Sequence, residues 1–351
     1  TIFLGMISMN TVFKYTCCCG KTDFLKLNAE GAHCKICDVI HPISNSGVIR
    51  FFKDSTNQNL YFDSLYADGY EHAKDVIEKD SEVVFNTAKE RSGMLLKSLG
   101  FQMQQPLEQL SILDAACGSG WVTAGFLQNE KINHCKLHAF DISPHGPEML
   151  SRFNMSLKTT NDLEMSVQDA EAMNFGDATF DLIIGSSILH HFDCYEKFLK
   201  DCRRILKPKG KVLFGEPFAI GYGLGAAALL IAQKQLGTQY KMVDALYKDI
   251  SFRNKSSRAM LNNLVDKHLF FQSTFIQLAN QIGFSSVEFN SPNPPEYYRD
   301  HFINELLRER GIVDARLTEE ANKIYEIIFD LFDDKSFEHS ISPFMDIVLT
   351  Q

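Results

Sequence analysis

From residue 111 onward, short apolar runs alternate with segments whose apolar residues recur every three or four positions. The apolar runs are bounded by Gly, Asp or Ser, which is typical of strands in a parallel sheet buried on both faces. The segments between them have the periodicity of amphipathic helices. Repeated strand–helix units of this length imply right-handed crossovers and a doubly wound α/β sheet. The expected strands are 111–117, 136–142, 163–169, 180–187 and 211–217, and the expected helices are 121–130, 147–157 and 195–207.

Two helical insertions interrupt this alternation, at about 218–268 and at about 292–340. Between and after them the pattern predicts a helix at 270–284 and strands at 286–291 and 344–351. The prediction is therefore a seven-stranded, mainly parallel, Rossmann-like sheet within a domain of residues 111–351. Insertions that follow the strand ends would form a lid at the carboxyl edge, where ligands bind in such folds.

The first strand leads into a turn of small residues, ILDAACGSG (112–120), and then directly into a helix. Small side chains let the backbone approach a ligand closely, and the helix N-terminus offers unpaired amides. A tight turn required only for packing would have the same sequence, so this motif alone is weak evidence.

Two further acids stand at the ends of the next two strands. Asp141 follows Gly120 by 21 residues, where a carboxylate can accept hydrogen bonds from both hydroxyls of a ribose. Asp169 ends the third strand, placed to accept from an adenine amine, with Ala170 leaving room for the ring. Each acid could instead be a helix N-cap, but their joint placement at consecutive strand ends favours a nucleoside site.

With these motifs in place, residues 111–217 resemble the class I S-adenosylmethionine-dependent methyltransferases, in particular the small-molecule and quinone methyltransferases. ILDAACGSG matches the family's first motif, although the family more often has Gly where this chain has Ala116. The resemblance implies that the first motif lines the methionine moiety, that Asp141 holds the ribose, that Asp169 contacts the adenine and that Ser186 and Ser187 lie near the sulfonium. The full set of expected cofactor-binding residues is Asp114, Ala116, Cys117, Gly118, Gly120, Asp141, Ile142, Asp169, Ala170, Ser186 and Ser187.

The implied reaction is in-line transfer of a methyl group to a small acceptor, for which near-attack geometry can supply most of the acceleration. A general base is needed only for a protonated oxygen or carbon nucleophile. His190 and His191 are the candidates for this base, and packing histidines are the alternative. O- or C-methylation is favoured. The lid is rich in aromatic and apolar residues, which favours an apolar or aromatic acceptor, although for each residue taken singly a place in the lid's own core is the preferred interpretation. The residues concerned are Phe218, Tyr222, Tyr240, Met242 and Phe252.

Two other functions use the same residues. The sulfonium could assist a cyclisation or decarboxylation without methyl transfer, or the chain could bind the cofactor or a macromolecule without catalysis. The motif set argues against the second of these.

Residues 1–52 form a separate cysteine-rich module, followed by a helical linker at 53–110. A CxC pair faces a CxxC pair across a short hairpin, which is close to a zinc-ribbon arrangement. The expected ligands of a structural zinc ion are Cys17, Cys19, Cys34 and Cys37, with Cys18 as the alternative to Cys17, and reduced cysteines without a metal as the alternative to the site.

Composition restricts the partners. A net charge of −9 disfavours a nucleic-acid substrate, because phosphate neutralisation needs clustered Lys and Arg. The apolar runs are shorter than the roughly 18 residues of a membrane span, and the N-terminal segment does not have the pattern of a secretory signal. Nine cysteines without a disulfide framework suit a reducing, cytoplasmic compartment. A homodimer is compatible with the sequence.

Overall fold

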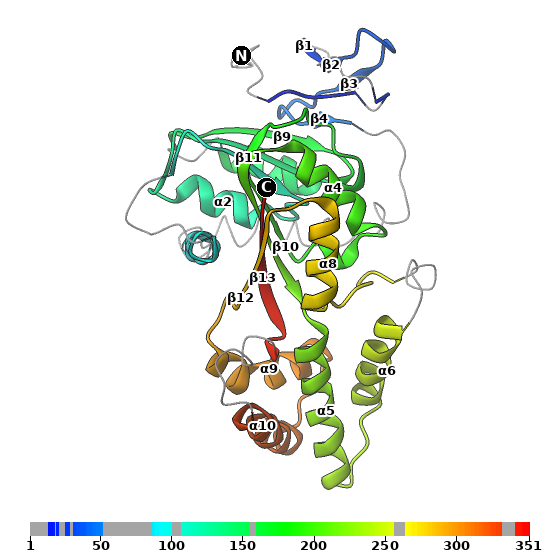
Figure 1. Ribbon diagram of the computed structural model, residues 1–351. Helices are drawn as coiled ribbons and strands as arrows, with labels where there is room; N and C mark the ends of the chain where they lie inside the picture. The colour runs from blue at the N-terminus through cyan, green and yellow to red at the C-terminus, as the bar shows by residue number, and fades with distance from the viewer. Residues whose placement is uncertain are drawn as a thin grey trace.

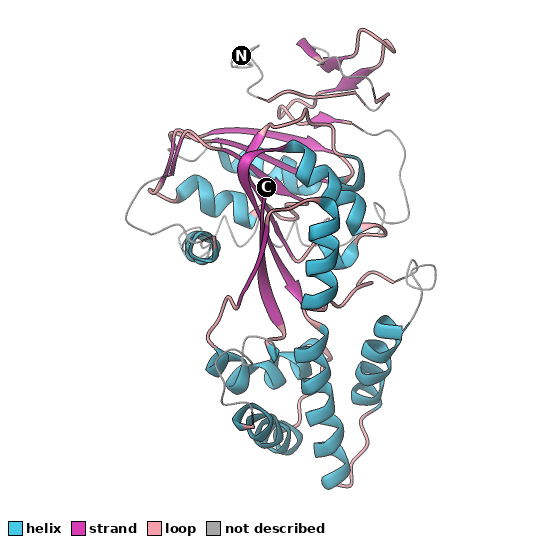
Figure 2. Ribbon diagram, in the orientation of Figure 1, coloured by secondary structure: helices cyan, strands magenta, loops and turns pink. Residues whose placement is uncertain are grey.

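The computed structural model describes residues 13–51, 86–99, 107–154, 159–255, 264–331 and 341–351, apart from residues 18, 21–24, 29–30 and 87. Its main sheet confirms the doubly wound α/β fold (Figures 1 and 2). The strand order is β12-β13-β11-β10-β6-β8-β9-β4, so the chain winds outward in both directions from β6. These strands are β6 (Ser111–Ala115), β8 (Lys136–Asp141), β9 (Asp162–Val167), β10 (Phe180–Ser186), β11 (Leu206–Pro217), β12 (Ser286–Asn290), β13 (Phe344–Thr350) and β4 (Ile49–Arg50).

The sheet has eight strands where the sequence predicted seven. The seven predicted strands are present, and β13 is antiparallel to both of its neighbours. The eighth strand, β4, comes from the cysteine-rich module and pairs parallel with β9. Its two residues carry no periodicity, so the pairing was not visible in the sequence.

Both faces of the sheet are covered by helices. Along β10, Ile183 packs in one hydrophobic cluster with Phe198, whereas its neighbour Leu182 packs in another with Phe126. This alternation follows from the two-residue period of a strand. One face carries α4 (Tyr195–Ile205) and α8 (Gln272–Ile282), and the other carries α2 (Trp121–Gln128), α3 (His145–Asn154) and the helical stretch 88–98.

The helix expected at 195–207 ends at Ile205. Proline disfavours the α conformation in the residue that precedes it, so Pro208 excludes Lys207 from the helix. The chain instead continues as β11 through a bulge, in which Phe180 pairs with Leu206 but Leu182 pairs with Lys211. Pro208 and Gly210 therefore lie in a strand irregularity and not in a helix-ending turn.

The two insertions pack against each other. They contribute α5 (Ala219–Gln235), α6 (Lys241–Lys255), α9 (Pro295–Glu309) and α10 (Ala315–Asp330) to one helical bundle with its own hydrophobic cluster. Figure 1 shows this bundle at one end of the molecule, beyond the tips of β10, β11 and β13. None of the helices that the structure describes is long and apolar enough to cross a membrane.

The cysteine-rich module lies at the opposite end of the molecule (Figure 1). Its strands β1 (Lys26–Asn28), β2 (Gly31–His33) and β3 (Ile40–Pro42) form an antiparallel sheet. Tyr15 attaches the module to the main sheet, since its buried hydroxyl donates to Glu164 at 2.5 Å and lies 3.2 Å from His138 Nδ1. The remaining short elements are β5 (Leu107–Glu108), β7 (Ile132–Asn133), η1 (Ala170–Ala172) and η2 (Leu189–His191). Most of the predicted 53–110 linker lies outside the described residues.

Candidate functional site

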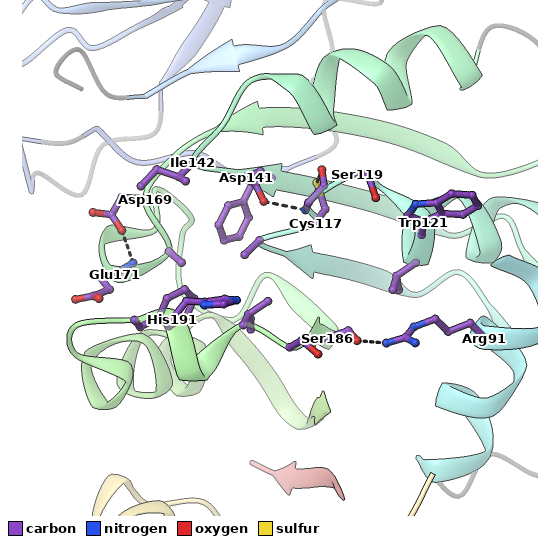
Figure 3. A pocket seen from close by; sticks show the side chains of 18 of the residues that line it. Arg91, Cys117, Ser119, Trp121, Asp141, Ile142, Asp169, Glu171, Ser186 and His191 are labelled. Atoms are coloured by element: carbon purple, nitrogen blue, oxygen red, sulfur yellow. Dashed lines mark hydrogen bonds between the residues drawn. The ribbon is translucent and has the colours of Figure 1, made fainter. Parts of the chain in front are cut away.

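A cavity of about 400 Å³ lies at the carboxyl ends of the central strands (Figure 3). Ten of the residues that the sequence singled out line it together, although they come from four different strand ends. In Figure 3, Asp169 and Glu171 lie at one end of the cavity, and Trp121 and Arg91 lie at the other. The predicted residues found in the lining are Ala116, Cys117, Gly118, Asp141, Ile142, Asp169, Ala170, Ser186, Ser187 and His191.

The turn after β6 is held against the cavity by Asp141. One carboxylate oxygen of Asp141 accepts from the Gly118 N–H at 2.8 Å, and the other accepts from the Ser143 N–H at 2.9 Å. Ala116 and Gly118 both adopt positive φ, 50° and 54°, so this turn uses a conformation that favours glycine. A Cβ on Gly146 would stand 1.6 Å from the Gly118 carbonyl oxygen, which shows how closely α3 packs on the turn.

Two predicted cofactor residues, Asp114 and Gly120, do not line the cavity. The Asp114 carboxylate turns toward α2, where it accepts from the Thr123 N–H at 3.1 Å and from the Thr123 hydroxyl at 2.6 Å. Gly120 precedes α2 and packs on Leu150, whose Cγ would stand 2.3 Å from an added Cβ. Both residues dock the helix that follows the turn, and this placement corrects the expectation that they face the ligand.

Burial raises the pKa of Asp114 to about 7, although the hydrogen bonds from Thr123 act in the opposite direction and lower this pKa. A raised pKa means that folding favours the protonated acid. The corresponding stability is present in full below pH 4 and is lost as the pH rises through about 7.

Asp114→Asn is therefore expected to stabilise the protein above pH 7 by up to about 4 kcal/mol, because the amide oxygen can still accept from Thr123 without a buried charge. Denaturant unfolding at pH 5 and pH 8 measures this, and the wild-type protein should lose more stability than the variant between the two. Equal losses in both proteins would contradict the assignment.

Asp169 is an N-cap, as one interpretation of the sequence expected, and its position is compatible with the other. It is the N-cap of η1, with its side chain accepting from the Glu171 N–H at 2.8 Å, and it also lines the cavity. A carboxylate has about four acceptor sites, so the cap leaves it free to bind a ligand. Capping and binding are thus not exclusive here.

The two histidines differ in position. His190 is buried and does not line this cavity. Its Nδ1 lies 2.7 Å from a carboxylate oxygen of Glu216. The other oxygen of Glu216 accepts from the amides of Ile188 and Leu189, so His190 belongs to a buried network under η2. His191 does line the cavity, and its Nδ1 lies 3.2 Å from Asp266.

Several lining residues were missed by the sequence analysis. Arg91 comes from the helical stretch 88–98 and donates to the hydroxyl of Ser186 (Figure 3). Trp121 is the first residue of α2 and also lines the cavity. The helical spacing around Arg91 was visible, but nothing in it indicated contact with β10. The other missed lining residues are Ala88, Ser119, Val122, Phe140, Glu171, Ile188 and Phe192.

A second cavity, of about 310 Å³, adjoins the first and shares Arg91, Ser186 and Ser187 with it. It lies between β13, α9 and the helical stretch 88–98, and its other lining residues are Met94, Leu95, Gly215, Pro292, Asn293, Tyr297, Tyr298, Glu305, Phe344, Met345 and Asp346.

The five expected lid-wall residues line neither cavity. Phe218 and Tyr222 pack against other aromatic rings, and Tyr240 donates to Asp314. Met242 and Phe252 are exposed. The alternative interpretation, that such residues serve the lid's own packing, holds for Tyr222, which packs on the cluster of the helical bundle. Phe218 instead belongs to the cluster between the sheet, α4 and α8.

The four cysteines expected to bind metal come together in the module. The sulfurs of Cys17, Cys19, Cys34 and Cys37 all lie within 4.8 Å of one another. His41 supports the cluster, with Nε2 3.4 Å from Cys17 Sγ. Cys18, the alternative ligand, lies outside the described residues. Four thiols at this separation can bind one zinc ion tetrahedrally.

The segment that supplies most of the cavity lining is similar to known proteins. Residues 113–214 match a family described as a methyltransferase domain. Over 161 residues the chain is 27% identical to the malonyl-[acyl-carrier protein] O-methyltransferase of Haemophilus ducreyi, covering 43% of this chain and 61% of that protein. Over 105 residues it is 33% identical to the demethylmenaquinone methyltransferase of Thermotoga maritima, covering 30% and 42%. The chain thus spans less than two thirds of each of these relatives.

Solved structures give a weaker likeness. Mycolic acid cyclopropane synthase CmaA1 superposes with a TM-score of 0.45 at 14% identity, covering 74% of this chain and 82% of that one. Phosphoethanolamine N-methyltransferase 2 of Haemonchus contortus gives 0.44 at 15% identity, covering 79% and 58%. The matched family covers β6 to β11, which supply the turn and the strand ends of the first cavity. Residues 113–214 of the chain are thus similar to a methyltransferase domain.

Proposed function

We propose that this protein binds S-adenosylmethionine in the first cavity and transfers its methyl group to a small molecule. The observation that carries the proposal is the convergence of the Asp141 carboxylate, the Asp169 carboxylate and the turn after β6 on one cavity of about 400 Å³. Asp141 would accept from the ribose hydroxyls and Asp169 from the adenine amine, because both retain acceptor capacity beside their backbone hydrogen bonds.

The charge of the cavity fits a cationic cofactor. Asp141, Asp169 and Glu171 line it with carboxylates, whereas Arg91 lies at the far end beside Ser186. When bound, the cofactor supplies an electrophilic methyl group on a sulfonium. The protein's part is to hold the nucleophile in line with that methyl group and to exclude water. O- or C-methylation would also require a residue that accepts a proton.

Two measurements test the proposal. Calorimetry should show one equivalent of S-adenosylhomocysteine binding to the folded protein, and failure to bind would refute the proposal. Cofactor labelled in the methyl group then separates the alternatives. Label in a small-molecule product supports methyl transfer, turnover of an acceptor without label in the product supports a cyclase or decarboxylase, and binding without any turnover supports a noncatalytic protein.

We also propose that Cys17, Cys19, Cys34 and Cys37 hold a structural zinc ion. The described part of the module contains only short strands, and most of its buried side chains belong to the hydrophobic cluster of the main sheet. A module of this size commonly needs a metal or disulfides for stability. The separation of the four sulfurs supports the site, and His41 beside Cys17 would orient that ligand.

A further inference from the structure

The two cavities meet at a junction formed by Arg91, Ser186, Ser187 and Gly215. Gly215 of β11 pairs with Ser186 of β10 in the parallel register. A Cβ on Gly215 would stand 3.2 Å from Asp346 Oδ1 and 4.0 Å from Ser186 Oγ. Because glycine has no Cβ, the space between these two oxygens stays open. A molecule in the second cavity can therefore reach atoms that border the first.

Asp346 is the buried carboxylate at this junction. It lies on β13, is 4% exposed, and lines the second cavity. Ser98 donates to Oδ2. Within the part of the chain that the structure describes, Oδ1 accepts no hydrogen bond and lies beside Gly215. Because Asp346 lines the second cavity, Oδ1 is open to it, and a ligand carrying an O–H or N–H group can donate a hydrogen bond there.

Charge and shape restrict that ligand. Arg91 lies close enough to interact electrostatically with Asp346, so the junction holds one positive and one negative charge. Because these two charges offset each other, the junction attracts neither an anionic nor a cationic ligand strongly. The walls beyond the junction combine apolar side chains, such as Met94, Leu95 and Phe344, with polar ones, such as Asn293, Tyr297 and Glu305. A neutral molecule that carries a hydroxyl group on an apolar body fits this mixed lining.

We propose that the second cavity binds the methyl acceptor, a small neutral hydroxyl compound, and that Asp346 is the catalytic base; this rests on the proposed methyltransferase function. The hydroxyl proton passes to Asp346 Oδ1 as the oxygen forms a bond to the methyl carbon. The carbon–sulfur bond breaks, and its electron pair stays on sulfur. The products are a methyl ether and S-adenosylhomocysteine, and Asp346 then releases the proton to solvent.

The surroundings of Asp346 suit a base. Burial raises the pKa of Asp346, and the Ser98 hydrogen bond and Arg91 act in the opposite direction. A carboxylate with a raised pKa takes a proton more readily at neutral pH. His190, by contrast, lines neither cavity and is held by Glu216. His191 lines only the first cavity, where the cofactor is proposed to bind, so we assign the base to Asp346 in the second.

The test uses cofactor labelled in the methyl group with phenol, benzylamine and benzoate, and with the three naphthalene analogues that carry the same groups. Label is expected in the phenol and naphthol only. Label in the amines or acids, or in none of the six while S-adenosylhomocysteine binds normally, overturns the proposal. If S-adenosylhomocysteine does not bind at all, the proposed function itself fails, so the two failures are distinguishable.

Two variants test the role of Asp346. Asp346→Asn, an isosteric change, is expected to lower kcat by roughly 10²- to 10⁴-fold, the usual contribution of a general base, and to leave the affinity for S-adenosylhomocysteine unchanged. Ser98→Ala removes the hydrogen bond that lowers the pKa of Asp346. It should shift the acidic limb of the kcat profile to higher pH, which a purely structural role would not do. Unchanged kcat in the first variant, or an unmoved limb in the second, contradicts the assignment.

Discussion

Asp141→Asn is expected to weaken the binding of S-adenosylhomocysteine by at least about 100-fold. Each oxygen of Asp141 accepts one backbone N–H, from Gly118 and from Ser143. An asparagine would present an NH₂ group to one of these donors and leave that amide unsatisfied. It would also lose charge-assisted bonds to the ribose, each worth about 1.5–3 kcal/mol. Two such bonds correspond to a factor of roughly 100 or more in Kd.

Calorimetry gives the affinity directly, and fluorescence gives a second measurement because the only tryptophan of the chain, Trp121, lines the cavity. The matched control is Asp162→Asn. Asp162 begins β9, at the opposite edge of the sheet from the cavity, and is exposed. This variant should bind as the wild type does. Wild-type affinity in Asp141→Asn would show that the ribose is held elsewhere.

The fold was predictable because its signals are local. Each central strand is a short apolar run, and each following helix has its own periodicity, so β6, β8, β9, β10 and β11 appeared in the sequence in the right order. The boundaries were less accurate where one residue restricts its neighbour, as Pro208 does at the end of α4. β4 pairs with β9 through residues more than a hundred positions apart, such as Ile49 and Ser166, so no local sequence pattern indicates this pairing.

The candidate site was predictable only in part, for a related reason. The motif identified the turn after β6 but not which of its acids faces the ligand, since the backbone directs Asp114 toward Thr123 and leaves Asp141 at the cavity. Arg91 and Asp346 enter through tertiary packing of distant segments. The lid residues were chosen by their apolar character alone, which cannot distinguish a cavity wall from the lid's own core.

Removal of the zinc ion is expected to have the largest effect on stability. Cys34→Ser would replace a buried thiolate ligand with a poor one, and zinc should fall from one equivalent per chain to none. Structural zinc binding contributes about 10–16 kcal/mol to the folding of small zinc domains, more than a module of short strands can supply otherwise. The module should then unfold, and limited proteolysis should cleave it while the methyltransferase domain stays intact.

Cys194→Ser is the control, since Cys194 lies outside the cluster and is half-buried. It should retain the metal and the wild-type protease resistance. Metal analysis of both purified variants, with and without a chelator, decides the outcome. A module that contains no zinc and resists protease equally in both variants would show that the four thiols pack without a metal.

Unfolding of the module should also disturb the main sheet. Tyr15 lies only two residues before Cys17, and its hydroxyl donates a hydrogen bond to Glu164 on β9. The strand β4 pairs with Ser166 and Val167 of the same strand, just before Asp169. Unfolding the module would expose β9 as an edge strand. It would also remove the buried Tyr15 hydroxyl that donates to Glu164. A weaker affinity for S-adenosylhomocysteine in Cys34→Ser, at unchanged kcat, is therefore the expected consequence at the cavity.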